Sequence, residues 1–150
     1  MNSFRMANKK QVSKYLLTFS NIIEDVLIRE LEILVANLEN HAKLTAGYED
    51  QTSNLKGSIG GVVLKDGRIV SKKGFDSGGA EGNTTGIEFI NSLIGYNTKG
   101  FVIILVAGME YATYQENFHN NNVLKKSELK MKRELPKVLS KLKLKIDKIK

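Results

Sequence analysis

The glycine-rich segment 74–86 (GFDSGGAEGNTTG) has the residue types that suggest chemistry most directly. Glycine-rich loops can cradle phosphate groups with their backbone N–H groups. A P-loop, however, places a Lys and a Ser or Thr directly after its last glycine, and here Gly86 is followed by Ile87. The glycine spacing of dinucleotide-binding loops is also missing. We therefore interpret segment 74–86 as a flexible surface loop.

Titratable side chains that could act in catalysis or hold a metal are scattered along the chain. His41 and His119 have no histidine or acid at the spacing that metal ligation requires. Asp76, Glu81 and Glu88 flank the glycines without the alternating oxygen ligands of a calcium loop. The sequence thus predicts no catalytic residue, no metal, no cofactor and no small-molecule substrate, and we interpret His41 as a solvated helix residue.

Two tyrosines and a glutamate follow the most apolar stretch of the chain. Tyr111 and Tyr114 are three residues apart, which places them on one side of a helix or turn, and Glu116 comes next. Tyrosine is favoured where one end of a side chain is buried and the other is wet. The pattern fits an interface with another protein as well as it fits the edge of the core.

The C-terminal segment carries the whole excess of positive charge. Residues 125–150 contain eleven Lys or Arg and three acidic residues, a net of +8, whereas residues 1–124 have a net charge of −1. The basic segment predicts contact with DNA or another acidic surface, or else the solvated face of an amphipathic helix. It has no aromatic residue on which bases could stack. The contacts would come from Lys125, Lys126, Lys130, Lys132, Arg133, Lys137 and Lys141.

Two long helices are predicted to enclose these segments. After a flexible N-terminus at residues 1–11, apolar residues recur every three or four positions over 12–46, which is typical of one helix. Residues 125–150 show a second helical pattern. Because proline lacks the backbone N–H that a helix uses, we expect a break near Glu134, just before Pro136.

A small sheet is predicted between the helices, over residues 57–108. Asp66-Gly67 between two apolar runs indicates a tight hairpin. Residues 87–94 form a short amphipathic segment, helix or strand. Phe101–Val106 is an uninterrupted apolar run rich in β-branched residues, which predicts a strand buried on both faces. The expected fold is α+β, with a long N-terminal helix, a small and mostly antiparallel sheet, and a C-terminal helix packed on the sheet.

Length and composition set the remaining limits. The 150 residues fit one domain, spanning 1–150. The absence of cysteine excludes disulfides and thiolate metal sites and favours an intracellular setting. We expect no signal peptide and no membrane contact, because the N-terminal residues lack an apolar core and no apolar run approaches the length of a membrane span.

Two motifs, in this order, resemble a known family. They are Tyr48-x-x-Gln51-Thr52-x-Asn54-Leu55-x-x-Ser58-Ile59-Gly60 and Ala107-Gly108-Met109-x-Tyr111-Ala112-x-Tyr114-x-Glu116. Together with the long helix before them and the helix after them, they resemble the tail-completion, or head–tail joining, proteins of long-tailed double-stranded DNA phages and prophages. The chain departs from the family pattern at Ser53, where glycine is usual, and at residues 117–119, where a Gly-Thr turn is usual.

The resemblance implies a structural virion protein without enzymatic activity. Such a protein assembles in the host bacterial cytoplasm into an oligomeric ring at the neck, between the capsid portal and the tail tube or its terminator. By this resemblance, contacts between subunits or with partners involve Thr52, Asn54, Leu55, Ser58, Tyr111, Tyr114 and Glu116.

Two other hypotheses remain. One is a small DNA-binding protein that acts through the lysine-rich C-terminal helix. The neutral body of the chain argues against it, although non-specific contact with phage DNA is compatible with either role. The other is an enzyme that binds a ligand through Gly78, Gly79 or Gly82, against which the failed phosphate motif argues.

Overall fold

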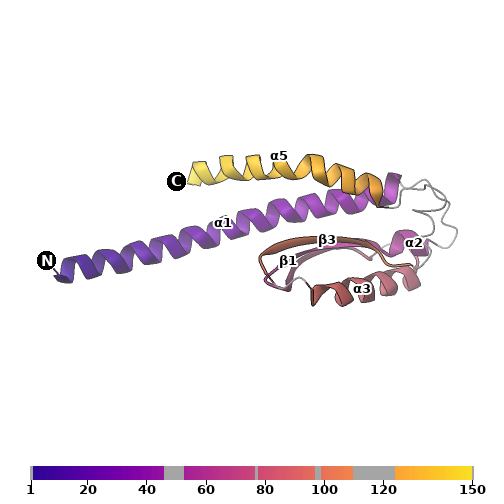
Figure 1. Ribbon diagram of the computed structural model, residues 1–150, viewed down its shortest axis with the longest axis horizontal. Helices are drawn as coiled ribbons and strands as arrows, with labels where there is room; N and C mark the ends of the chain where they lie inside the picture. The colour runs from indigo at the N-terminus through magenta and orange to yellow at the C-terminus, as the bar shows by residue number, and fades with distance from the viewer. Residues whose placement is uncertain (1, 46–52, 77, 97–98, 110–123, 150) are drawn as a thin grey trace.

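The computed structural model describes residues 2–45, 53–76, 78–96, 99–109 and 124–149. Two long helices lie side by side above a small sheet, and a shorter helix lies below it (Figure 1). The elements in chain order are α1 (Asn2–Thr45), α2 (Asn54–Gly57), β1 (Ile59–Lys65), β2 (Arg68–Gly74), α3 (Ala80–Ile94), β3 (Phe101–Ala107) and α5 (Lys125–Ile149). The predicted α+β class is confirmed.

The sheet has the strand order β2-β1-β3, and both pairings are antiparallel. The β1–β2 hairpin turns at Asp66 and Gly67, both of which have positive φ. Two positive φ angles are characteristic of a type I′ turn, whose twist matches that of the flanking strands. The predicted hairpin is thus confirmed, and it places β1 at the centre of the sheet, where it pairs on both sides.

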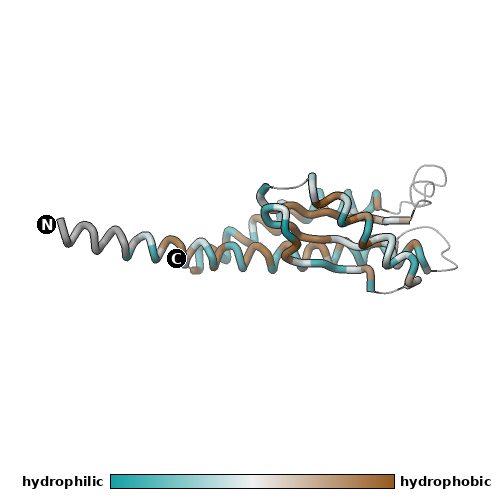
Figure 2. The backbone as a smooth tube through the Cα atoms, turned by 90° about the horizontal axis from the view of Figure 1, so that it is seen from below, coloured by the Kyte–Doolittle hydropathy of each residue, from teal (hydrophilic) through white to brown (hydrophobic). Residues whose placement is uncertain are grey.

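Side chains of β1 alternate between two apolar layers. Val62 and Leu64 pack toward α3 with Ile90 and Val106, while Val63 packs toward α1 with Val35. All of these residues are at most 3% exposed. The period-two alternation of a strand therefore builds a core on each face of the sheet. Seen from below, stretches of hydrophobic residues run along strands of the sheet (Figure 2).

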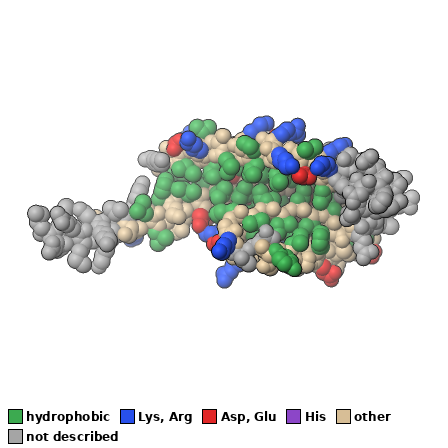
Figure 3. All heavy atoms as spheres, in the orientation of Figure 1, with side chains coloured by type: hydrophobic (Ala, Val, Ile, Leu, Met, Phe, Trp, Pro, Cys, Tyr) green, Lys and Arg blue, Asp and Glu red, His purple; other side chains and the backbone are tan. Residues whose placement is uncertain are grey.

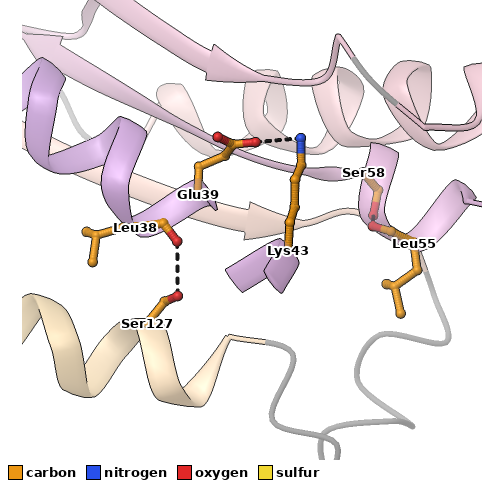
Figure 4. Close-up of polar contacts among 6 residues, drawn as sticks. All are labelled: Leu38, Glu39, Lys43, Leu55, Ser58 and Ser127. Atoms are coloured by element: carbon orange, nitrogen blue, oxygen red, sulfur yellow. Dashed lines mark hydrogen bonds and ion pairs between the residues drawn. The ribbon is translucent and has the colours of Figure 1, made fainter. Parts of the chain in front are cut away.

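Helix α5 runs antiparallel to α1. Near its start, the Ser127 hydroxyl donates to the carbonyl oxygen of Leu38 at 3.0 Å (Figure 4). Farther along, Lys145 pairs with Glu30, and Leu142 is buried. The C-terminal helix is predicted to pack on the sheet. It packs chiefly against α1, and Leu135 reaches the apolar layer between α1 and the sheet.

Two predictions about the long helices are wrong: the start of the first helix and the break in the last one. Helix α1 begins at Asn2, so residues 2–11 are helical and not a flexible N-terminus. No Gly or Pro interrupts the sequence there, and the helix simply continues. Helix α5 runs through Pro136 without ending. Pro136 is exposed, and buried residues on both sides of it hold the helix against α1.

Strand β3 is not buried on both faces, contrary to the prediction. Its residues from Phe101 to Leu105 are half-buried, and only Val106 is fully buried. The reason is its position at the edge of the three-stranded sheet. The strand buried on both faces is β1, whose Gly60 and Gly61 make it look less apolar in the sequence.

Candidate functional site

The described glycines of segment 74–86 make close packing contacts, and residues 80–86 of the predicted loop are helical. A Cβ atom on Gly82 would lie 1.9 Å from the carbonyl oxygen of Asn54, so helix α3 touches the backbone of α2. The buried ring of Phe75 fills a space beside Gly60 and Gly86, where either Cβ would come within 2.5 Å of it. The glycines therefore bring α3 against α2 and the sheet, and residues 80–86 form the first turns of that helix. Residues 87–94, left open between helix and strand, are its continuation.

Asn54 completes the N-terminus of α3 from another element. The N-cap position of α3 is Gly79, which has no side chain to accept the free N–H groups of the first turn. The Asn54 side chain supplies the acceptor, because Gly82 N–H donates to Oδ1 at 3.3 Å, and its Nδ2 donates to Glu81 at 3.0 Å. Asn54 therefore acts as a capping residue, but it belongs to α2 and caps the N-terminus of a different helix, α3.

Leu55 and Ser58 are structural positions within the subunit. Leu55 is 1% exposed and Ser58 is fully buried. The Ser58 hydroxyl donates to the Leu55 carbonyl oxygen at 2.8 Å (Figure 4). It also accepts from the N–H of Met109 at 3.3 Å. The predicted interface role of these two side chains is therefore wrong for the folded chain, because neither reaches the surface.

The predicted contacts at Thr52, Tyr111, Tyr114 and Glu116 lie outside the described residues, as does His119. They stay predictions.

The open edge of the sheet is an apolar strand with half-buried side chains. We use "open edge" for strand β3, whose seven residues include no charged or polar side chain. Figure 3 shows hydrophobic side chains gathered in the middle of this face, between α5 and α3. A cavity of about 250 Å³ opens beside it, lined by Leu38, Ile103, Leu105, Leu124, Ser127, Glu128 and Met131. Contiguous apolar surface of this kind marks contact sites.

The N-terminal part of α1 forms a projecting arm. Helix α1 extends past the C-terminal end of α5 and past the sheet (Figure 1). At 1.5 Å per residue its 44 residues span about 66 Å. Leu16 and Leu17 on this arm are 57% and 65% exposed. The arm is a second apolar surface without a partner among the described residues.

The lysines predicted to touch DNA fall into two groups. Some are engaged by nearby glutamates: Lys125 and Lys132 with Glu128, Lys137 with Glu134, and Lys141 with Glu30. Lys130 and Arg133 form no ion pair among the described residues, and Lys126 lies beside them on α5. The pairs with Glu128 and Glu134 are largely exposed and therefore weak, so they leave most of the positive field of their lysines in place.

Glu30 is the one buried carboxylate among the described residues, at 4% exposed. It accepts a hydrogen bond from Lys145, and Lys141 lies 3.6 Å away. The bond from Lys145, aided by the charge of Lys141, holds the pKa of Glu30 below its ordinary value despite the opposing effect of burial. This group fixes the register of α5 on α1.

His41 is part of the α1–α5 contact and not a freely solvated residue. Its Nδ1 lies 3.2 Å from the Ser127 hydroxyl, whose single proton goes to Leu38. Ser127 therefore accepts at this contact, and Nδ1 carries the proton. Burial lowers the pKa of His41, and the nearby charges of Lys130, Arg133 and Lys126 lower it further.

Two further kinds of site are absent from the described ranges. No three His, Asp or Glu side chains there converge closely enough to hold a metal ion. Among these residues, no helix combines the length and the apolar composition that crossing a membrane requires. Comparison of the chain with protein-family models, curated proteins and solved structures finds no match.

Proposed function

We propose that this chain is a structural protein of a tailed phage or prophage, and that it forms part of the ring that joins the capsid portal to the tail. The observation that carries the proposal is the open edge at β3, an apolar strand left unpaired on one side among the described residues. Edge strands of monomeric proteins are usually blunted by charge or proline. Strand β3 has neither.

The opposite edge of the same sheet supports this interpretation. Strand β2 carries Arg68, Lys72 and Lys73, and its pairing with β1 is interrupted by a register shift after Val63. Charged residues and irregular pairing are the devices that discourage edge-to-edge association. One edge is thus protected and the other is not, which favours a directional contact at β3.

A ring requires such a directional arrangement. In a closed ring each subunit presents one surface to the neighbour before it and a different surface to the neighbour after it. The open edge is one suitable surface, and the projecting arm of α1 provides a second. The order of elements, with a long helix before the sheet and a helix after it, agrees with the resemblance to head–tail joining proteins.

The proposal is tested by the mass of the purified chain in solution, measured by light scattering at low and high salt, and by electron microscopy. We expect a closed oligomer that persists in high salt and appears as rings, because apolar contacts are not screened by salt. If the chain alone is monomeric, it is mixed with purified portal and tail-tube proteins. A chain that neither closes into a ring nor binds either protein would contradict the proposal.

A further inference from the structure

Five cations of α5 lie on one flank of the helix. They are separated by three or four residues, which places them along a single stripe. We call this set the basic stripe: Lys126, Lys130, Arg133, Lys137 and Lys141. At 1.5 Å per residue the stripe spans about 22 Å. Lys125 and Lys143 fall about a third of a turn away, on a different flank.

The basic stripe lines a groove between α5 and α1. At one end a shallow pocket of about 590 Å³ is lined by His41 and by Lys126, Leu129, Lys132 and Arg133 of α5. A second pocket, of about 210 Å³, lies farther along the same two helices and is lined by Glu30, Ile33, Leu34, Asn37, Lys130, Glu134, Lys137, Val138 and Lys141. Residues of α5 that approach β3, such as Met131, lie on another flank. The groove and the open edge are therefore separate surfaces.

Positive charge in this groove exceeds negative charge. The two carboxylates that line it are Glu30, which Lys145 already engages from outside the stripe, and the half-buried Glu134. The pocket beside His41 is lined by three cations and no carboxylate. The lowered pKa of His41 has burial as its first cause, and the charges of Lys130, Arg133 and Lys126 add to it, so the positive field reaches this ring.

We propose that the groove between α1 and α5 binds the phosphates of a nucleic-acid backbone along the basic stripe, with one phosphate in the pocket beside His41. Duplex DNA presents a phosphate about every 3.4 Å along each strand, so a stripe of about 22 Å faces about six of them. A row of cations suits a repeating anion better than a single one. With no aromatic side chain on α5, the contact reads no bases and is not selective for sequence.

The test compares two double variants of the full chain. Lys130→Gln with Lys137→Gln removes two cations of the stripe, and Lys125→Gln with Lys143→Gln removes two from elsewhere on α5. The pairs are matched, because each removes two charges and includes one lysine with a glutamate partner three residues away. Binding to a labelled duplex oligonucleotide of mixed sequence is followed by fluorescence anisotropy over a range of salt concentrations.

We expect the stripe variant to bind more weakly and its dependence of log K on log salt to be shallower by about 1.8, or about 0.9 per lost phosphate contact. The matched control should keep the slope of the wild type. Equal losses in both variants would overturn the proposal, because they would indicate general attraction to a basic helix. Failure of the wild type to bind the duplex would also overturn it.

Inorganic phosphate carries the same kind of anion as a nucleic-acid backbone, and an NMR titration of the histidines distinguishes binding of the two. A phosphate seated beside His41 should raise the pKa of that ring, while His119 serves as the second histidine signal in the same spectrum. We expect the duplex to shift the His41 titration at concentrations where inorganic phosphate does not. A saturable shift with inorganic phosphate and none with the duplex would overturn the assignment to a backbone. Light scattering on the same variants measures their oligomeric state, so a loss of DNA binding can be distinguished from a loss of ring formation.

Discussion

The two layers that cover the sheet are built in opposite ways. Below it, α3 approaches so closely that glycines are required, with Gly82 against the backbone of Asn54 and Gly86 against the ring of Phe75. Above it, α1 and α5 are held by long side chains, including the Glu30 contacts with Lys141 and Lys145. The lower layer leaves little space, whereas the upper layer leaves grooves between its helices and beside β3.

We infer from this difference that the lower layer contributes most to stability and that the exposed surfaces of the upper layer are available for contacts. Helix α1 lies over β1 and β2 more than over β3, so the third strand keeps half-exposed side chains beside α5. The basic stripe and the projecting arm also belong to this upper layer. Changes in the lower layer should therefore affect folding most, and changes on the upper surfaces should affect binding.

The largest effect is expected for Gly82→Ala in the lower layer. The new methyl group would overlap the carbonyl of Asn54, so α3 must move away from α2. We expect a loss of at least about 3 kcal/mol in the free energy of unfolding, measured by urea denaturation. Gly95→Ala is the control, because a Cβ atom there would meet no atom within 4 Å apart from those of its neighbours along the chain. Equal stability of the two variants would contradict the close packing of α3.

Glu30→Gln should give the next largest effect, because it removes the charge that engages two lysines of α5. We expect a loss of about 2 kcal/mol in the free energy of unfolding. Because the pKa of Glu30 is lowered in the folded chain, this contribution is present above its ordinary value of 4.5 and is lost as the pH falls further. Glu128→Gln, at an exposed pair, is the control and should change stability little.

Asn54→Ala tests the cap that crosses from α2 to α3. Loss of the acceptor for the Gly82 N–H should cost about 1 kcal/mol in thermal or urea unfolding. Asn91→Ala changes an exposed asparagine of α3 itself and should leave stability nearly unchanged. If both variants unfold alike, Asn54 does not complete the N-terminus of α3.

The smallest effect concerns His41 in the upper layer. Its pKa lies below the ordinary value of 6.5, so the folded chain binds a proton less readily than the unfolded chain. Stability should therefore decline slightly as the pH falls from 6.5 through the lowered pKa. His41→Gln should abolish that part of the pH dependence in thermal unfolding. If His41→Gln leaves the pH dependence of thermal unfolding unchanged, the pKa of His41 does not differ between the folded and the unfolded chain.

The sequence predicts the elements that have strong local signals. The hairpin followed from Asp66-Gly67, because the turn chemistry is local, and the long helices followed from the spacing of apolar residues. The α+β class follows from the order of these elements. Strand β3 was recognised as a strand, but its place in the sheet depends on pairing between distant segments, which the apolar run does not encode.

The sequence-based predictions were wrong where tertiary contacts determine the local structure. The glycines of α3 looked like a loop because glycine is a poor helix former, yet close packing against Asn54 and Phe75 requires them. The proline of α5 looked like a break, but it faces solvent and its neighbours are held by α1. In the candidate site, the sequence identified the basic residues. It did not separate the stripe from the lysines elsewhere on α5, because the position of α1 defines the groove.

The central claim, that subunits associate through the open edge, is tested most directly by one pair of substitutions. Leu105→Lys places a charge on β3, and Ile69→Lys places the same charge on the protected edge at β2, where Ile69 is 43% exposed. The mass of each variant is measured by light scattering in high salt, with circular dichroism to verify folding. We predict that Leu105→Lys dissociates the oligomer and that Ile69→Lys does not. An oligomer that survives Leu105→Lys and dissociates with Ile69→Lys would contradict the account.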